Sequence, residues 1–138
     1  DIFIGVAAVA DYRPKVVAGE KIKKQAASLD IELVRNPDIL AEVAACDPAP
    51  FTVGFAAETE RVETFAETKR VAKRLNMIAA NRVGAGEGGF ESDRNALILL
   101  WEGGREILPM MDKTQLAQLL AERIEALYHA QIGVAADD

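Results

Sequence analysis

Three short, almost continuous apolar runs constrain the fold more than any other feature of this sequence. They are IFIGVAAVA (2–10), FTVGFAAE (51–58) and MIAANRV (77–83). Their length and their β-branched residues favour strands that are buried on both faces, as in a parallel sheet. Because helical patterns alternate with such runs, the sequence predicts an α/β domain with a mainly parallel sheet and helices on both faces.

The spacing of apolar residues predicts helices over 36–46, 60–76 and 112–130. Asn36 is a good N-cap for the first helix, Pro37 suits the first helical position, and Asp38 suits the positive end of the helix dipole. Thr59 is a candidate cap for the second helix. The third carries its leucines on one face, which is typical of an amphipathic helix packed on a core.

The remaining segments are a strand, a hairpin and a long loop. Residues 31–36 alternate apolar and polar side chains, which predicts a strand. Residues 95–110 predict two strands joined around the glycine pair 103–104, so we expect a hairpin near the C-terminus. Residues 11–30 lack clean periodicity and predict a long loop, and loops of that length inside compact domains are usually functional.

Composition excludes several classes of protein and site. The 138 residues suit one domain, and the net charge of −6 argues against nucleic-acid binding, which needs a broad basic face. One cysteine, Cys46, and one histidine, His129, cannot build the usual zinc sites. The longest apolar runs are too short to span a membrane. A lone cysteine also suits a reducing compartment, so we expect a cytoplasmic protein.

Candidate binding residues follow the predicted strands, because ligands bind at the carboxyl ends of strands in open α/β sheets. The segments there are AVADY (8–12), NPDIL (36–40), GFAAET (54–59) and AANRV (79–83). Asp11 either ends a strand or contributes a carboxylate to a site. Phe55 is either a core residue or a platform for a base. The start of the helix at NPDIL is either a simple cap or, through its free N–H groups, a site for an anion or a ribose.

Two groups of lysines are candidates for binding an anion. Lys69 and Lys73 are four residues apart, so they share one helical face beside the apolar stripe. Like the lysines of EKIKK (20–24), they are either solvated or directed at a phosphate. The glycine-rich GAGEGG (84–89) lacks the lysine and Ser/Thr of a phosphate loop, and we interpret it as an ordinary loop. Scattered cations, one aspartate and a helix start suit a nucleoside triphosphate, whose reactions depend on positioning and charge neutralisation.

Seven motifs share their order and spacing with a known family. They are AAVADYRP (7–14), EKIKK (20–24), NPDIL (36–40), VGFAAET (53–59), KRVAK (69–73), AANRV (79–83) and NALILLW (95–101). Together with the final amphipathic helix they cover essentially the whole chain. The chain thereby resembles the phosphopantothenoylcysteine synthetase domain of bacterial bifunctional coenzyme A biosynthesis proteins.

The resemblance implies a Rossmann-like fold and a CTP-dependent ligase. In this family 4′-phosphopantothenate attacks the α-phosphate of CTP, which gives an acyl-cytidylate and pyrophosphate. The amine of cysteine then attacks the activated acyl carbon, and CMP leaves. Mg²⁺ normally accompanies the triphosphate, and the synthetase domains form homodimers.

The resemblance also implies roles for residues of this chain. Lys21, the first lysine of EKIKK, would contact the nucleotide and promote the reaction as a catalytic residue. Asp11 would lie at the nucleotide and near the metal. Phe55 would sit by the base or ribose, and Lys69 and Lys73 would bind phosphates. The further nucleotide contacts would be Ala7, Pro37, Asp38, Ile39 and Leu40.

Two parts of the family pattern are not found in this sequence. In the family, a glycine-rich start and an SxxSSGKMG-like stretch that handles phosphopantothenate precede the AAVADY strand, and the bifunctional proteins also contain an FMN-dependent decarboxylase domain. We therefore expect residues 1–138 to be one domain, the later part of the ligase domain of a longer protein, which by itself binds nucleotide poorly and does not complete the ligation. The alternative is a non-catalytic Rossmann-like nucleotide-binding or interaction module. An NAD(P) dehydrogenase is disfavoured because no dinucleotide fingerprint is present.

Overall fold

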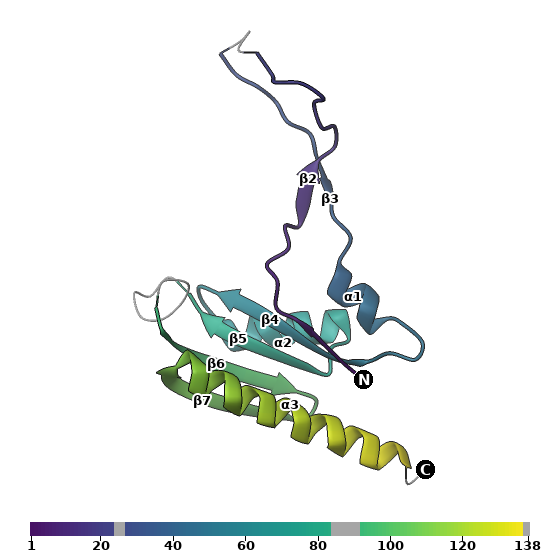
Figure 1. Ribbon diagram of the computed structural model, residues 1–138, viewed down its shortest axis with the longest axis vertical. Coiled ribbons are helices and arrows are strands. Elements are labelled where there is room, and N and C mark those ends of the chain that lie inside the picture. Colours follow the sequence, from purple (N-terminus) through teal and green to yellow (C-terminus); the bar gives the residue numbers. More distant parts are fainter. Residues whose placement is uncertain (24–26, 84–91, 137–138) are drawn as a thin grey trace.

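A five-stranded sheet forms the centre of the protein in the computed structural model, which describes residues 1–23, 27–83 and 92–136. The strand order is β1-β4-β5-β6-β7 (Figure 1). These strands are β1 (Ile2–Gly5), β4 (Phe51–Glu58), β5 (Met77–Arg82), β6 (Arg94–Trp101) and β7 (Gly104–Asp112). β1, β4 and β5 pair in parallel, whereas β6 pairs antiparallel with both β5 and β7. This mixed sheet of mainly parallel strands confirms the predicted Rossmann-like α/β class.

Helices pack on both faces of this sheet, as predicted. In the described part of the chain they are α1 (Ile39–Ala44), α2 (Val62–Lys73) and α3 (Lys113–Ala136). Successive residues of a strand point to opposite faces, so β4 contributes to two cores. Phe51 and Val53 join the core that contains Leu116 and Ile124 of α3, whereas Ala56 joins the core that contains Ala66 of α2.

Gly54 in β4 lets α1 and α2 approach the sheet closely. A Cβ atom at this position would lie 2.7 Å from Leu75 Cδ1 and 2.9 Å from Leu40 Cδ2. Gly5, which faces Gly54 across the β1–β4 pairing, would place a Cβ atom 3.2 Å from Leu40 Cδ1. The absence of side chains at these two positions therefore determines how near the start of α1 lies to the sheet.

Residues 6–23 leave the sheet and residues 27–36 return to it, and these two segments form an extended arm (Figure 1). Within the arm, β2 (Tyr12–Pro14) and β3 (Leu33–Arg35) pair antiparallel and form a separate two-stranded sheet. Figure 1 shows the arm projecting away from the main sheet, with β2 and β3 in its lower half.

The structure of the arm differs from three boundaries that were predicted from the sequence. The strand predicted over 2–10 ends at Gly5, where its pairing with β4 stops. Val6 lies beyond that pairing and is 61% exposed, although it belongs to the same apolar run. The strand predicted over 31–36 shortens to β3, and the loop predicted over 11–30 contains β2, because these two short segments are strands only through pairing with each other.

Two predicted helix caps are wrong. The N-cap of α1 is Asp38, whose Oδ1 accepts a hydrogen bond from Ala41 N at 3.1 Å. Asn36 does not serve as the cap, because its side chain is bonded to the backbone of the arm. α2 begins after Arg61, whose backbone is left-handed with φ of 46°, rather than after Thr59.

The C-terminal half agrees with the predictions more closely. β4 has the predicted bounds of 51–58, and the β6–β7 hairpin turns at Gly103, which has φ of 74°. α3 covers most of the predicted helix and continues to Ala136. The glycine-rich segment 84–89 and Lys24 lie outside the described residues.

Candidate functional site

Two lysines of α2 form ion pairs with acidic residues on neighbouring elements. Lys73 Nζ lies 2.9 Å from Oδ2 of Asp38, at the start of α1. Lys69 Nζ lies 2.6 Å from Oε1 of Glu58, the last residue of β4. The two cations therefore meet the start of α1 and the carboxyl end of a parallel strand, which is where ligands bind in open α/β folds.

Asp38 has a lowered pKa because its carboxylate is stabilised from two sides. The hydrogen bond from Lys73 is the largest cause, and the bond from the backbone N–H of Ala41 adds to it, while partial burial opposes both. The charged form thus caps α1 and holds Lys73 at the same time. One carboxylate connects the helix start predicted to bind nucleotide with a lysine predicted to bind phosphate.

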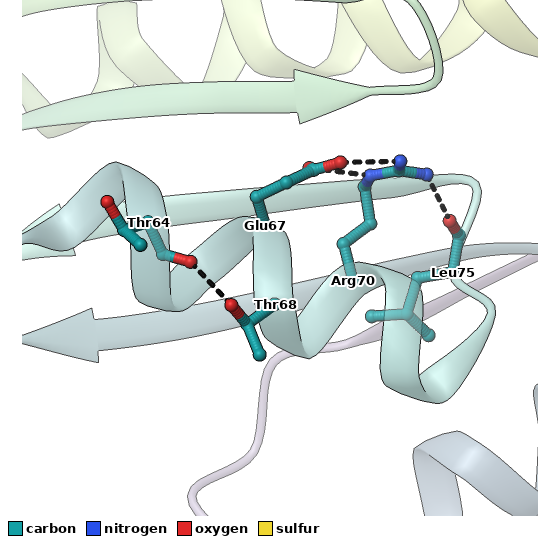
Figure 2. Close-up of polar contacts among 5 residues, drawn as sticks. All are labelled: Thr64, Glu67, Thr68, Arg70 and Leu75. Carbon is teal, nitrogen blue, oxygen red and sulfur yellow. Dashed lines mark hydrogen bonds and ion pairs between the residues drawn. The ribbon is translucent and has the colours of Figure 1, made fainter.

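Arg70 stabilises the C-terminal end of α2, which carries these lysines. Figure 2 shows its guanidinium bonded to both carboxylate oxygens of Glu67, at 2.8 and 2.7 Å, and to the carbonyl of Leu75 at 3.2 Å. The pairing lowers the pKa of Glu67 and raises the pKa of Arg70. Such a two-point contact is geometrically specific. It stabilises the turn that places Leu75 over Gly54.

The root of the arm brings the AVADY and NPDIL segments side by side. The amide of Asn36 donates from Nδ2 to the carbonyl of Ala10 at 2.6 Å. Its Oδ1 accepts from Arg13 Nη1 at 2.9 Å, and its backbone N–H donates to the carbonyl of Asp11 at 2.8 Å. Arg13 Nη1 also donates to the carbonyl of Arg35 at 2.9 Å. The outgoing and returning segments are therefore joined directly beside the β2–β3 pairing, at residues 10–13 and 35–36, which form the root of the arm.

The other predicted contacts near this junction differ in exposure. Pro37 and Ile39 are exposed, whereas Leu40 is half-buried against the sheet glycines. Ala7 and Asp11 are exposed on the segment that leaves β1. The structure thus brings residues 10 and 11 next to Asn36, which directly precedes Pro37, and contact of these segments with a nucleotide stays a prediction.

Lys21 lies apart from this junction. It is exposed on the arm beyond β2, as is its neighbour Lys23. The structure therefore places the predicted catalytic lysine on a slender extension and the predicted phosphate-binding lysines on a helix packed against the sheet. The role of Lys21 stays a prediction.

Phe55 lies on the opposite face of the sheet from the α2 lysines. Its half-buried side chain packs against the core under α3. It also lines an apolar groove of about 350 Å³ between β1 and α3, together with Ile4, Leu120 and Ile124. The structure does not bring Phe55 together with Lys69 and Lys73, and its contact with a base or ribose stays a prediction.

The described ranges 1–23, 27–83 and 92–136 contain neither a metal-ligand cluster nor a membrane-spanning helix. No three His, Cys, Asp or Glu side chains are grouped there in a way that could hold a metal ion. No helix in those ranges is long and apolar enough to cross a bilayer.

Comparison with known proteins identifies the family. The model of the DNA/pantothenate metabolism flavoprotein C-terminal domain matches residues 1–128. This chain belongs to that family. The coenzyme A biosynthesis bifunctional protein CoaBC of Escherichia coli K12 is 53% identical over 132 residues, and that of Vibrio cholerae is 53% identical over 126 residues. These alignments cover 93% and 89% of this chain, which spans about a third (32%) of the length of each relative.

Two solved structures share the fold. The C-terminal domain of a coenzyme A biosynthesis bifunctional protein CoaBC superposes with a TM-score of 0.71 at 33% identity, covering 94% of this chain and 56% of that one. The DNA/pantothenate metabolism flavoprotein from Streptococcus pneumoniae superposes with a TM-score of 0.62 at 21% identity, covering 88% and 58%. The second likeness concerns the fold alone.

The side-chain contacts of three residues were not predicted from the sequence, although Asn36 and Glu58 lie in the candidate segments NPDIL and GFAAET. Glu58 is the partner of Lys69, Arg13 bonds to Asn36, and the Asn36 side chain ties the arm instead of capping a helix. The sequence signal for Glu58 was a lone acidic residue at the end of an apolar strand. Arg13 and Asn36 are 23 residues apart, and no local pattern reveals that they meet.

Proposed function

We propose that this chain is the nucleotide-binding part of a CTP-dependent phosphopantothenate–cysteine ligase of coenzyme A biosynthesis. The observation that carries the proposal is the junction formed by Asn36, which bonds to residues 10 and 11, and by Asp38 at the start of α1, which pairs with Lys73 of α2. Family membership supports the assignment of this junction to a nucleotide.

The α2 lysines suit the phosphates of the nucleotide. A lysine ammonium is a compact charge on a flexible stem, so Lys69 and Lys73 can exchange a carboxylate for a phosphate oxygen without movement of α2. Both are partly exposed, with 50% and 34% of their side chains accessible. In this proposal Glu58 and Asp38 hold the two ammonium groups in place until the triphosphate arrives.

The proposed reaction has two steps. The carboxylate of 4′-phosphopantothenate attacks the α-phosphorus of CTP, a P–O bond breaks, and pyrophosphate leaves with both electrons. The amine of cysteine then attacks the acyl carbon, CMP departs, and the amine loses a proton as the amide forms. Lys21 would be the catalytic cation: the arm would carry it over the triphosphate, where its charge offsets the negative charge that builds up on the phosphates.

A divalent cation would assist the nucleotide. Mg²⁺ is usually held by one or two carboxylates together with substrate phosphates and water. The exposed carboxylate of Asp11, beside the proposed nucleotide segments, fits such a site, and the bound ion would neutralise phosphate charge. FMN is assigned to the decarboxylase domain and has no proposed ligand among residues 1–138.

Binding and turnover experiments test this function. Calorimetry with CTP, ATP and NADH should show a preference for CTP, and binding of NADH alone would overturn the proposal. Pyrophosphate release should require a chain that includes the upstream phosphopantothenate-handling segment of the ligase domain and should be absent with residues 1–138 alone. CTP binding without turnover in the full-length chain would favour a non-catalytic nucleotide-binding module instead.

We also propose that the arm forms part of a homodimer interface in a cytoplasmic enzyme. Val16, Val17 and Ile22 on the arm are 79%, 83% and 60% exposed, and three such exposed apolar side chains so close in sequence favour an interaction surface. Sedimentation equilibrium should show a dimer that weakens when Val16 and Val17 are both replaced by serine. A monomer at micromolar concentration in the unchanged protein would refute this.

A further inference from the structure

A few hydrogen bonds join the two sides of the arm at its root, residues 10–13 and 35–36. β2 and β3 have three residues each, and their side chains are mostly exposed, so packing against the body contributes little to holding them. At the root, Asn36 and Arg13 bridge the outgoing and returning segments through both side chains and backbone. Residues farther along the arm, including Lys21, are connected to the sheet through these two segments.

Asn36 is suited to this position because an amide has both a donor and an acceptor. Its Nδ2 donates to Ala10, next to the Asp11 segment, and its Oδ1 accepts from Arg13. A carboxylate in its place would turn an oxygen toward the carbonyl oxygen of Ala10, which cannot donate a hydrogen bond to it. An alanine would remove the hydrogen bonds to both Ala10 and Arg13. Asn36 also directly precedes Pro37 and Asp38. Its side chain therefore connects the start of α1 with the Ala10–Asp11 segment and with Arg13 of the arm.

We propose that Asn36, held by Arg13, is a positioning residue that orients the arm so that Lys21 reaches the reacting phosphates. The inference rests on the proposed function, because it assigns Lys21 a catalytic contact. Asn36 itself is not proposed to touch the substrate. Its effect is transmitted through the backbone of residues 10–13 and 35–36, which form the two sides of the root.

Steady-state kinetics of the full-length enzyme test the inference. Asn36→Ala and Asn36→Asp should each lower kcat by about 10- to 100-fold, the range expected when a catalytic group is misplaced by about an ångström. The KM for CTP should change less than about threefold, because Lys69 and Lys73 stay on α2. Full kcat in Asn36→Asp would overturn the inference.

A second pair of variants separates positioning from a general loss of structure. In a Lys21→Gln background, Asn36→Ala should cause no further loss of kcat, because the group that it orients has already been removed. Lys15→Gln is the matched control: Lys15 pairs with Glu32 farther along the same arm, at 2.8 Å, but takes no part in the root contacts. It should leave kcat unchanged.

The possible outcomes are distinct. If Lys21→Gln is fully active, both the proposed function of Lys21 and the positioning inference fail. If Lys21→Gln is impaired and Asn36→Ala is not, or if their effects simply multiply, the inference alone fails. Should Asn36→Ala unfold, as judged by circular dichroism, Arg13→Gln removes the guanidinium side of the same contact. Arg13→Gln must then lower kcat in the parent enzyme and cause no further loss of kcat in the Lys21→Gln background.

Discussion

Replacing Gly54 by alanine tests whether close packing of α1 positions the proposed nucleotide site. The new methyl group would lie 2.7 Å from Leu75 Cδ1 and 2.9 Å from Leu40 Cδ2, so both leucines must move. Overpacking of a buried site costs typically about 1–3 kcal/mol. With a melting entropy of roughly 0.3 kcal/mol/K for a domain of this length, the melting temperature should fall by about 3–10 °C.

Differential scanning calorimetry measures this shift, and two other glycines provide matched controls. Gly19→Ala, where no atom beyond the adjacent residues lies within 4 Å of the added carbon, should melt within a degree or two of the parent protein. Gly5→Ala, with its nearest contact at 3.2 Å, should fall between the two. Because Leu40 belongs to the helix start proposed to bind CTP, Gly54→Ala should also raise the KM for CTP. A Gly54→Ala variant with the same melting temperature as Gly19→Ala would refute the packing argument.

Three further predictions concern charged residues of the site and the arm. Asp38→Asn keeps an acceptor for the α1 cap but loses the ion pair with Lys73, so urea unfolding at pH 7 should show a loss below about 1 kcal/mol, as expected for a pair this exposed. Because the pKa of Asp38 is lowered in the folded protein, its charged form stabilises the fold at pH values above the ordinary aspartate pKa of about 3.9. This stabilisation declines below that value and is lost as the pH falls through the folded pKa. A difference in unfolding free energy between parent and Asp38→Asn that persists at lower pH would contradict this. Lys69→Gln and Lys73→Gln should each raise the KM for CTP by about 10- to 100-fold, the equivalent of one charge-assisted hydrogen bond, and an unchanged KM in both would argue against phosphate binding at α2. Lys21→Gln should reduce turnover severely without altering the melting temperature, and unchanged turnover would exclude a catalytic role for this lysine.

The elements that were predicted well carry their signal within a short stretch of chain. β4 has a continuous apolar run between two polar segments, and α3 repeats its leucines at helical spacing. The β6–β7 hairpin has a glycine pair at its turn, where Gly103 requires a positive φ. In these cases the local pattern matches the environment in the fold, because β4 is buried on both faces of the sheet and α3 packs its leucines against one core.

The elements that were predicted poorly depend on partners distant in sequence. Nothing local distinguishes the first four residues of IFIGVAAVA, which pair with β4, from the last five, which enter the arm. β2 and β3 are too short to have a recognisable period, and each is defined by the other. The same reason applies to the site: both lysines of α2 were found from their spacing, but their partners Asp38 and Glu58 come from two other elements.

The root of the arm also affects how readily the parallel sheet can assemble. Ile2 must find Phe51, and the chain between them includes the whole arm, in which Tyr12 faces Arg35. If the arm closes first, the length of chain that remains to be looped is roughly halved, which lowers the entropic cost of closure by about 0.6 kcal/mol. The hydrogen bonds of Asn36 and Arg13 would then form before the sheet does, and they would shorten the loop that must close for β1 to pair with β4. Weakening them should slow folding more than it speeds unfolding, the behaviour of contacts already formed in the transition state.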